Sequence, residues 1–323
     1  MITFLLRRVL QAIPLVLLIS MVIFGILEKA PGGPLAPYLQ NPHLTQADVD
    51  RLKHNFGLDQ PVPVQYAHWL GHVLQGDFGY STSNSMPVGA AILDRLPATL
   101  ELMGCSFALS LVLGVGAGVF AAMRPYTRWD YLITTLAFYG QAMPVFWLGL
   151  MLQLAFAVHG LEGFGYIIRL PSAGRCSTDA CDVADQALHL ILPTIVLAFV
   201  NLATWSRFTR ASMLDVLALD YMRTAAAKGL SPWTIVIKHG LRNALTPVVT
   251  IIALTMPSMI GGAVVTETIF SWPGMGRLFY TALGQFDFAL LMAYLTLLAI
   301  LVVVSNMVAD VMYAVLDPRV RLS

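Results

Sequence analysis

The sequence predicts an all-α integral membrane protein with six transmembrane helices, and two observations carry this prediction. The first is composition: only 11% of the 323 residues are charged, 57% are hydrophobic, and the mean hydropathy is +0.72. Soluble domains carry about 25% charged residues, so part of this surface must face lipid. The second is a set of six runs without charged residues or histidine: Val9–Leu27, Leu102–Met123, Tyr131–Val158, Leu190–Ser206, Thr246–Thr266 and Phe288–Ala309.

Each run has roughly the length of a membrane-spanning helix, because crossing the hydrocarbon core takes about 20 apolar residues. Backbone polar groups in lipid must be satisfied within the segment, which makes the runs helical. The first run is longer than the apolar region of a cleaved signal peptide, about 7–15 residues. We therefore expect Val9–Leu27 to remain as the first span.

The basic residues predict the orientation. By the positive-inside rule, the loops that carry most lysine and arginine face the cytoplasm. Here they cluster before the first run, between runs two and three, between runs four and five, and after run six. The residues are Arg7, Arg8, Arg124, Arg128, Arg207, Arg210, Arg223, Lys228, Lys238, Arg242, Arg319 and Arg321. Both termini are therefore expected in the cytoplasm.

This topology divides the chain into four segments. Residues 1–27 form an N-terminal transmembrane helix, and residues 28–98 an extracytoplasmic loop with short helices. Residues 99–316 form a five-helix core that includes a cytoplasmic loop at 207–245, and residues 317–323 a cytoplasmic tail. In the long outer loop, Thr45 is placed to cap a helix over Gln46–Asn55 that ends at Gly57. A second, amphipathic helix is expected over Val64–Leu74.

The motifs of several enzyme and carrier classes are missing. The chain has no phosphate-binding Gly-x-x-x-x-Gly-Lys-Ser/Thr loop, no His-Glu-x-x-His and no Gly-x-Ser-x-Gly. The six runs contain no carboxylate or histidine, the groups that mark proton relays and ion sites in membranes. We therefore predict no catalytic residue and no metal ligand. A secondary carrier and an intramembrane enzyme are the disfavoured alternatives.

The loop between runs four and five carries the most information. Asp220–Gly229 reads as a helix that ends at Gly229. Ser231 is placed to cap a second helix over Trp233–Arg242, with Pro232 at its first position. Two short helices joined by a tight turn would make a compact knob. A solvated basic loop is the alternative.

This knob resembles a known family. Residues 223–231, Arg-Thr-Ala-Ala-Ala-Lys-Gly-Leu-Ser, and residues 238–249, Lys-His-Gly-Leu-Arg-Asn-Ala-Leu-Thr-Pro-Val-Val, are similar to the cytoplasmic "EAA" loop of ABC importer permeases of the peptide/nickel branch. Residues 266–277, Thr-Glu-Thr-Ile-Phe-Ser-Trp-Pro-Gly-Met-Gly-Arg, are similar to the segment after span five in that branch. Residues 4–14, 144–149 and 317–319 match the first of its two paired permeases. The general motif opens Glu-Ala-Ala, whereas this chain has Arg223, Thr224 and Ala225.

The resemblance implies a type I ABC importer permease fold in a bacterial cytoplasmic membrane. The chain would form the translocation path for di- or oligopeptides, and a nickel chelate or glutathione is the alternative cargo for the same architecture. Implied partners are a second homologous permease, two ATP-binding subunits or domains, and an extracytoplasmic substrate-binding protein. ATP and Mg²⁺ would be held by those ATPases, and this chain would carry no cofactor, bind no nucleic acid and catalyse no reaction.

The resemblance also assigns residues. Contact with the ATPase is expected from Arg223, Ala225, Ala226, Lys228, Gly229, Leu230 and Ser231. Polar or small residues near the spans could line the passage or bond between helices, namely Gln141, Asn201, Ser258, Gly261 and Glu267.

Two local patterns leave alternatives open. Cys176 and Cys181 lie in a polar loop and would form a disulfide if that loop faces an oxidising compartment; two free thiols are the alternative. Gly114 and Gly118 have the spacing that permits close helix packing, either within the bundle or against another subunit.

Overall fold

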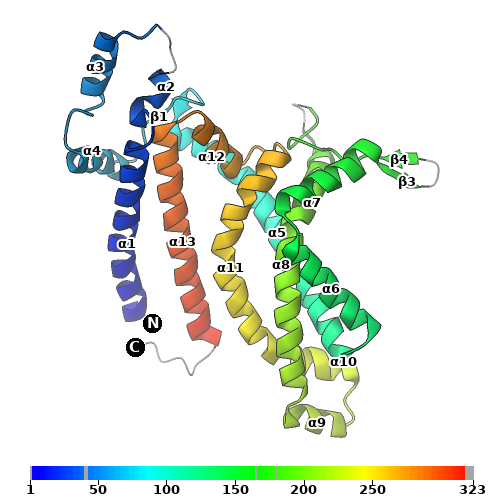
Figure 1. Ribbon diagram of the computed structural model, residues 1–323. Coiled ribbons are helices and arrows are strands. Elements are labelled where there is room, and N and C mark those ends of the chain that lie inside the picture. The colour runs from blue at the N-terminus through cyan, green and yellow to red at the C-terminus, as the bar shows by residue number, and fades with distance from the viewer. Residues whose placement is uncertain (1, 40–42, 164–165, 179–180, 317–323) are drawn as a thin grey trace. The chain divides into compact units, whose positions relative to one another are not determined.

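The computed structural model describes residues 2–39, 43–163, 166–178 and 181–316 (Figure 1). Within these ranges, the side chains of residues 2–5, 161–163, 166–168, 232, 250, 253–262, 309 and 312–316 lie outside the description. The chain forms two compact units. The first consists of Met1–Ala98 and Gly274–Met307, and the second of Thr99–Pro273 and Val308–Leu322.

The first unit contains two long helices and the outer elements. Its elements are α1 (Ile2–Glu28), a 3₁₀ turn (Gly33–Leu35), α2 (Ala36–Leu39), α3 (Gln46–Asn55), α4 (Val62–Leu74), β1 (Tyr80–Ser81), β2 (Met86–Pro87), α12 (Met275–Gly284) and the start of α13 (Phe288–Leu316). β1 and β2 pair antiparallel, with Tyr80 opposite Pro87. Helix α5 (Val88–Met123) begins in this unit and continues into the second.

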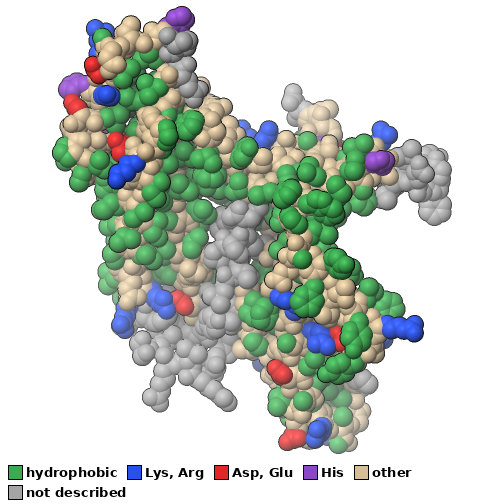
Figure 2. All heavy atoms as spheres, viewed as in Figure 1, with side chains coloured by type: hydrophobic (Ala, Val, Ile, Leu, Met, Phe, Trp, Pro, Cys, Tyr) green, Lys and Arg blue, Asp and Glu red, His purple; other side chains and the backbone are tan. Residues whose placement is uncertain are grey.

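Aromatic side chains pack α4 against the end of α1 and the start of α13. These two helices lie side by side in Figure 1. The Phe24 ring meets Tyr66 edge-on at 5.7 Å and Phe288 at 5.6 Å between centroids. Ser20 Oγ and Tyr66 OH lie 2.8 Å apart in a hydrogen bond. The rest of α1 exposes its apolar side chains, as Figure 2 shows on its visible face, in keeping with a lipid-facing span.

The predicted helices of the outer loop are present. Helix α3 has the predicted bounds, and Thr45 caps it by accepting a hydrogen bond from the Asp48 amide at 3.3 Å. Gly57 follows with a left-handed φ of 66°. Helix α4 begins at Val62, two residues earlier than predicted, because proline is favoured in the first helical turn and Pro63 occupies it.

The second unit is built around two long helices. Its elements are the rest of α5, α6 (Arg128–Ala142), α7 (Val145–Leu152), a π-helix (Gln153–His159), β3 (Leu161–Gly163), β4 (Tyr166–Ile168), α8 (Val183–Leu217), α9 (Asp220–Ala227), α10 (Pro232–Thr234), a π-helix (Ile235–Leu241) and α11 (Arg242–Ile269). Helix α8 packs along both α6 and α11. It also packs closely on α5, since a Cβ at Gly118 would lie 2.6 Å from the Ser206 carbonyl oxygen. The Gly114/Gly118 pattern therefore serves packing within the chain.

Four helices in the described residues are long and apolar enough to cross a membrane: Leu6–Glu28, Val88–Met123, Val183–Leu217 and Phe288–Val308. The bent pair Arg128–Ala142 and Val145–His159 would make a fifth span. The remaining predicted run, Thr246–Thr266, lies within helix α11. The side chains at the centre of α11 lie outside the description, so the four helices named above do not include it.

Two predicted helices are not regular. The run Tyr131–Val158 is bent by 106° between α6 and α7. Pro144 disfavours a helical conformation at the residue before it, and Met143 is extended, with φ −80° and ψ 125°. The expected second helix of the knob, Trp233–Arg242, is a short α-turn followed by a π-helix that runs directly into α11. An inserted π-turn shifts the register of the helix beyond it.

Candidate functional site

Helix α9 has one buried and one exposed face. Met222 and Ala225, three residues apart, are buried, while Arg223, Thr224 and Ala226 are exposed. Positions three apart lie on one side of a helix. Helix α9 therefore packs on the rest of the unit through one face. Figure 1 places α9 and α10 at one end of α8.

The core beneath α9 is built from methionines and small residues. Met222 packs with Met213 of α8 and Val236 of the π-helix, all buried. A Cβ at Gly240 would lie 3.3 Å from Met222 Cε and 3.4 Å from Met213 Cε. Gly240 therefore gives the two methionine side chains the room in which they meet.

The turn after α9 has the predicted geometry. Gly229 adopts a left-handed φ of 74°, the conformation favoured at a helix C-terminus. No atom lies within 4 Å of a Cβ built there, so only the backbone conformation selects glycine. The Ser231 hydroxyl accepts a hydrogen bond from the Thr234 amide at 3.3 Å and so caps α10.

Polar contacts fasten α9 to the start of α11. The Asn243 side-chain amide donates to Tyr221 OH at 2.8 Å and to the His239 carbonyl oxygen at 3.2 Å. Together with the methionine core, these contacts make residues 220–242 one compact knob. The knob is continuous with α11 and packed against α8.

Several apolar side chains on and beside the knob are exposed. Trp233 is 65% exposed. Leu219, Tyr221, Leu230 and Ile237 are also exposed. Of the predicted contact residues, Ala225 is buried and cannot offer surface; the others, namely Arg223, Ala226, Lys228, Gly229, Leu230 and Ser231, are exposed. Exposed aromatic and aliphatic side chains on a rigidly packed element are a feature of protein-binding surfaces.

The residues considered for the passage lie in different surroundings. Gln141 is exposed, and Asn201 is half-buried and donates to the Leu197 carbonyl oxygen of its own helix at 3.1 Å. Glu267 is fully buried and accepts a hydrogen bond from Thr99 Oγ1 at 2.7 Å. The side chains of Ser258 and Gly261 lie outside the description. The described residues of this group do not form a single exposed surface.

An ion pair between the buried Asp130 and the partly exposed Arg210 joins α6 to α8 and was not predicted. Arg210 Nε and Nη2 donate to the two carboxylate oxygens of Asp130, each at 2.6 Å. The Asp130 side chain is 3% exposed. Arg210 was considered only as one of the basic residues that orient the chain. No local pattern could have linked two residues 80 positions apart.

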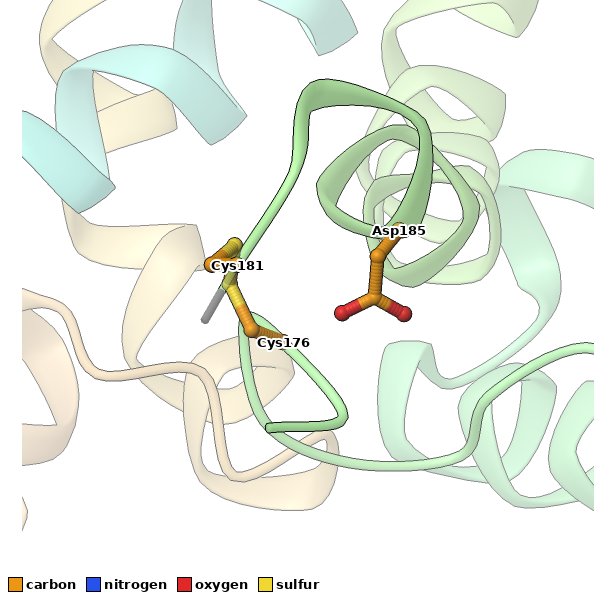
Figure 3. Close-up of side chains that lie close together, drawn as sticks. All are labelled: Cys176, Cys181 and Asp185. Atoms are coloured by element: carbon orange, nitrogen blue, oxygen red, sulfur yellow. A yellow bond between two sulfur atoms is a disulfide. The ribbon is translucent and has the colours of Figure 1, made fainter. Parts of the chain in front are cut away.

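At the other end of α8, the structure joins Cys176 and Cys181 in a disulfide, and Asp185 of α8 lies beside it (Figure 3). The Ser177 amide and hydroxyl both donate to the Asp185 carboxylate, at 2.6 and 2.7 Å. Cys176, Cys181 and Asp185 bring three potential ligand atoms within 4.8 Å of one another. Because the two sulfurs are bonded to each other, neither is available as a thiolate for a metal.

The same loop ties three helices together. Arg175 forms an ion pair with Glu101 of α5, with Nη2 2.8 Å from Oε2, and Gln186 of α8 donates to the other Glu101 oxygen. The Gly174 amide donates to the carbonyl oxygen of Phe270, just past α11, at 2.9 Å. This loop therefore joins Glu101, in the interior of α5, to the start of α8 and to the residue just past α11.

Comparison with known proteins places the chain in a family. The profile described as "Binding-protein-dependent transport system inner membrane component" matches residues 114–322, and a profile for the N-terminal part of such membrane components matches residues 1–103. The chain belongs to this family. It is a permease subunit of an ATP-driven importer, working with an ATPase and a binding protein, and is not itself an enzyme.

Individual relatives agree with this assignment. The oligopeptide transport system permease protein AppB of Bacillus subtilis is 44% identical over 99% of this chain and 100% of its own length. The glutathione transport system permease protein GsiC of Salmonella typhimurium is 38% identical over 99% of each chain. The inward-facing MetNI methionine ABC transporter superposes with a TM-score of 0.54 at 17% identity, covering 70% of this chain and 96% of the transporter chain. This last likeness shows that the fold is that of an importer permease.

Proposed function

We propose that this permease forms one half of the translocation path of a di- or oligopeptide importer. The other half would be a second homologous permease. Two ATP-binding subunits or domains would hold ATP and Mg²⁺, and an extracytoplasmic binding protein would deliver the peptide. The whole-length likeness to the oligopeptide permease AppB supports this cargo.

One observation carries the coupling mechanism: the knob exposes Trp233 and other apolar side chains while its methionine core packs on α8. Docked on an ATPase, the knob would turn movement of that subunit into movement of the spans. Buried tryptophans dominate many protein interfaces, and truncating one costs about 2 kcal/mol or more of binding free energy. Trp233→Ala should therefore weaken retention of the ATP-binding subunits that co-purify with the tagged permease.

A cross-link gives an independent test of docking. In a background with Cys105→Ser, a cysteine at exposed Ala226 should cross-link to a cysteine introduced on the ATPase. Ser83→Cys, in the outer loop, is the matched control and should not cross-link. Unchanged subunit retention in Trp233→Ala, together with no cross-link at Ala226, would contradict the docking proposal.

The orientation belongs to the same proposal. Both termini and the knob would face the cytoplasm, and residues 28–98 would form an outer cap that meets the binding protein. A membrane-impermeant maleimide should label Ser83→Cys in intact cells and Ser231→Cys only after the membrane is opened. The opposite labelling pattern would reverse the topology.

Among the described residues proposed for the translocation path, Gln141 is the exposed one and therefore fits a path residue best.

Glutathione is the second candidate cargo, favoured by the likeness to GsiC; a nickel chelate remains the third. These cargoes differ in chemistry: glutathione is a tripeptide with a thiol and a γ-linked glutamate, whereas ordinary peptides have uniform α-linkages. Titrating the purified binding protein with tri-alanine, glutathione and a nickel chelate separates them. Tightest binding of tri-alanine supports the peptide proposal, and tightest binding of either rival replaces it.

A further inference from the structure

One short stretch of α8 contacts several elements of the second unit. Thr209 lies against α5, where a Cβ at Gly118 would be 2.6 Å from Thr209 Cβ. Ser212 Oγ donates to the Ala244 carbonyl oxygen at the start of α11, at 2.8 Å. The same stretch of α8 also presents one side chain to α6 and one to the knob.

Arg210 faces α6 and Met213 faces the knob. The Arg210 guanidinium binds both Asp130 oxygens at 2.6 Å. Met213 is fully buried beneath Gly240 and Met222. Three residues apart, the two side chains are joined by less than one turn of continuous helix. A displacement of the knob at Met213 must therefore move Arg210 as well.

Asp130 is anchored on its own side. It lies in the first turn of α6, whose cap Thr127 accepts a hydrogen bond from the Asp130 amide at 3.5 Å. The Tyr126 amide donates to Asp130 Oδ2 at 2.9 Å. The carboxylate thus joins the beginning of α6 to α8. Separating a buried ion pair leaves an uncompensated charge, so the two helix segments are held to move together.

We infer that Asp130 and Arg210 are positioning residues that transmit movement of the knob to α6. The inference rests on the proposed docking of the knob to an ATPase. Apolar contacts can slide, whereas a bidentate guanidinium–carboxylate pair fixes both distance and orientation. This pair, which we call the clamp, makes α6 follow α8 during each ATP cycle.

The test uses the intact importer in proteoliposomes. Asp130→Asn removes the charge, and Arg210→Lys keeps the charge but loses the two-pronged geometry. Each should reduce binding-protein-stimulated ATP hydrolysis and tri-alanine uptake about tenfold, within the usual range of coupling between sites. Basal hydrolysis and the Ala226 cross-link should stay at the wild-type level. The melting temperature should fall in Asp130→Asn, which leaves the Arg210 charge without its partner. The exchange Asp130→Arg with Arg210→Asp should recover part of the stimulation.

Arg128→Gln is the matched control, because it removes an exposed charge from the same turn of α6 and should behave as wild type. Full stimulation in both Asp130→Asn and Arg210→Lys would overturn the clamp. Loss of the Ala226 cross-link and of basal hydrolysis in parallel with stimulated hydrolysis would show that the pair only supports the fold, and would also overturn the clamp. If the exchange variant fails to assemble, the stimulated ATP hydrolysis of Arg210→Lys alone decides whether the clamp transmits movement. If Ala226→Cys fails to cross-link in an importer with an intact clamp, that result would instead contradict the docking proposal.

Discussion

The knob and the outer helix α3 are both short helical elements, but the chain fastens them in opposite ways. Helix α9 buries Met222 and Ala225, and the knob shares a core with α8 and runs directly into α11. Helix α3 buries none of its ten residues and is stabilised at its start by Thr45 and Asp48. A change in the knob should therefore reach the long helices, whereas a change in α3 should remain local.

The difference also concerns what each element exposes. The knob presents apolar side chains such as Trp233 and Ile237, while α3 presents mainly polar ones, among them Arg51 and Lys53. A rigidly mounted apolar surface suits force transfer from a tightly bound subunit. A locally stabilised polar helix suits a contact that forms and breaks. The following predictions test this contrast, beginning with the largest expected effect.

Gly240→Leu should have the largest effect. A Cβ there already lies 3.3–3.4 Å from two methionine methyl groups, and the added branch would overfill the knob core. Overpacking costs about 1–3 kcal/mol, and here it would also displace α9 from α8. We expect lost ATPase retention and a lower melting temperature. Gly104→Leu, where no atom lies within 4 Å of the new Cβ, is the control. Equal behaviour of the two variants would mean that the knob is not rigidly mounted.

Asp287→Ala should have the next largest effect, confined to the first unit. The buried Asp287 carboxylate accepts hydrogen bonds from the Ser81 hydroxyl at 2.6 Å and the Ser83 hydroxyl at 2.8 Å. Leaving such donors unpaired costs about 1–3 kcal/mol. We expect faster hydrogen exchange in residues 80–87 with normal ATPase retention. Loss of ATPase retention would break the contrast between the outer elements and the knob.

Gly229→Val should have a moderate effect on coupling and a small one on folding. A positive φ costs a residue with a Cβ about 1 kcal/mol or more. Space around the position is open, so the strain is in the backbone and shifts α10. Membrane abundance should stay normal while stimulated uptake falls. Gly229→Asn, which tolerates this conformation better, should retain more uptake. Wild-type uptake in the valine variant would show that the turn geometry does not matter.

Local features were predictable from sequence, and long-range ones were not. The bounds of α3 and the left-handed Gly229 follow from capping residues next to the helices they end. No local pattern specifies the π-helix before α11 or the contact of its Gly240 with methionines from two other helices. The Asp130–Arg210 pair and the Thr99–Glu267 bond join residues 80 and 168 positions apart. Ala225 is buried because it lies on the same side of α9 as Met222, and the sequence of α9 alone does not say which side packs on the protein.

The smallest expected effect concerns the start of α3. The Thr45 hydroxyl and amide both donate to the Asp48 carboxylate, at 2.6 and 3.1 Å. The Thr45 hydroxyl, and then its backbone amide, lower the pKa of Asp48 below its ordinary value. Because the pKa is depressed in the folded state, the contribution of Asp48 to helix stability is present above the ordinary pKa of about 3.9. It is lost as the pH falls through the lowered folded-state pKa.

Thr45→Ala removes the hydroxyl, and with it the bond from the Asp48 amide and the bond to the Asp48 carboxylate, while the bond from the Thr45 backbone amide remains. In the intact chain at pH 7, hydrogen exchange of residues 46–55 should speed up severalfold, with no change in the knob. Below the lowered pKa of Asp48, part of the difference between Thr45→Ala and wild type should vanish. Asp50→Asn, an exposed carboxylate on the same helix, is the control and should change neither pH profile nor exchange. A pH-independent difference would mean that the Thr45–Asp48 bonds do not stabilise α3. Altered exchange in the knob would mean that α3 is not locally held.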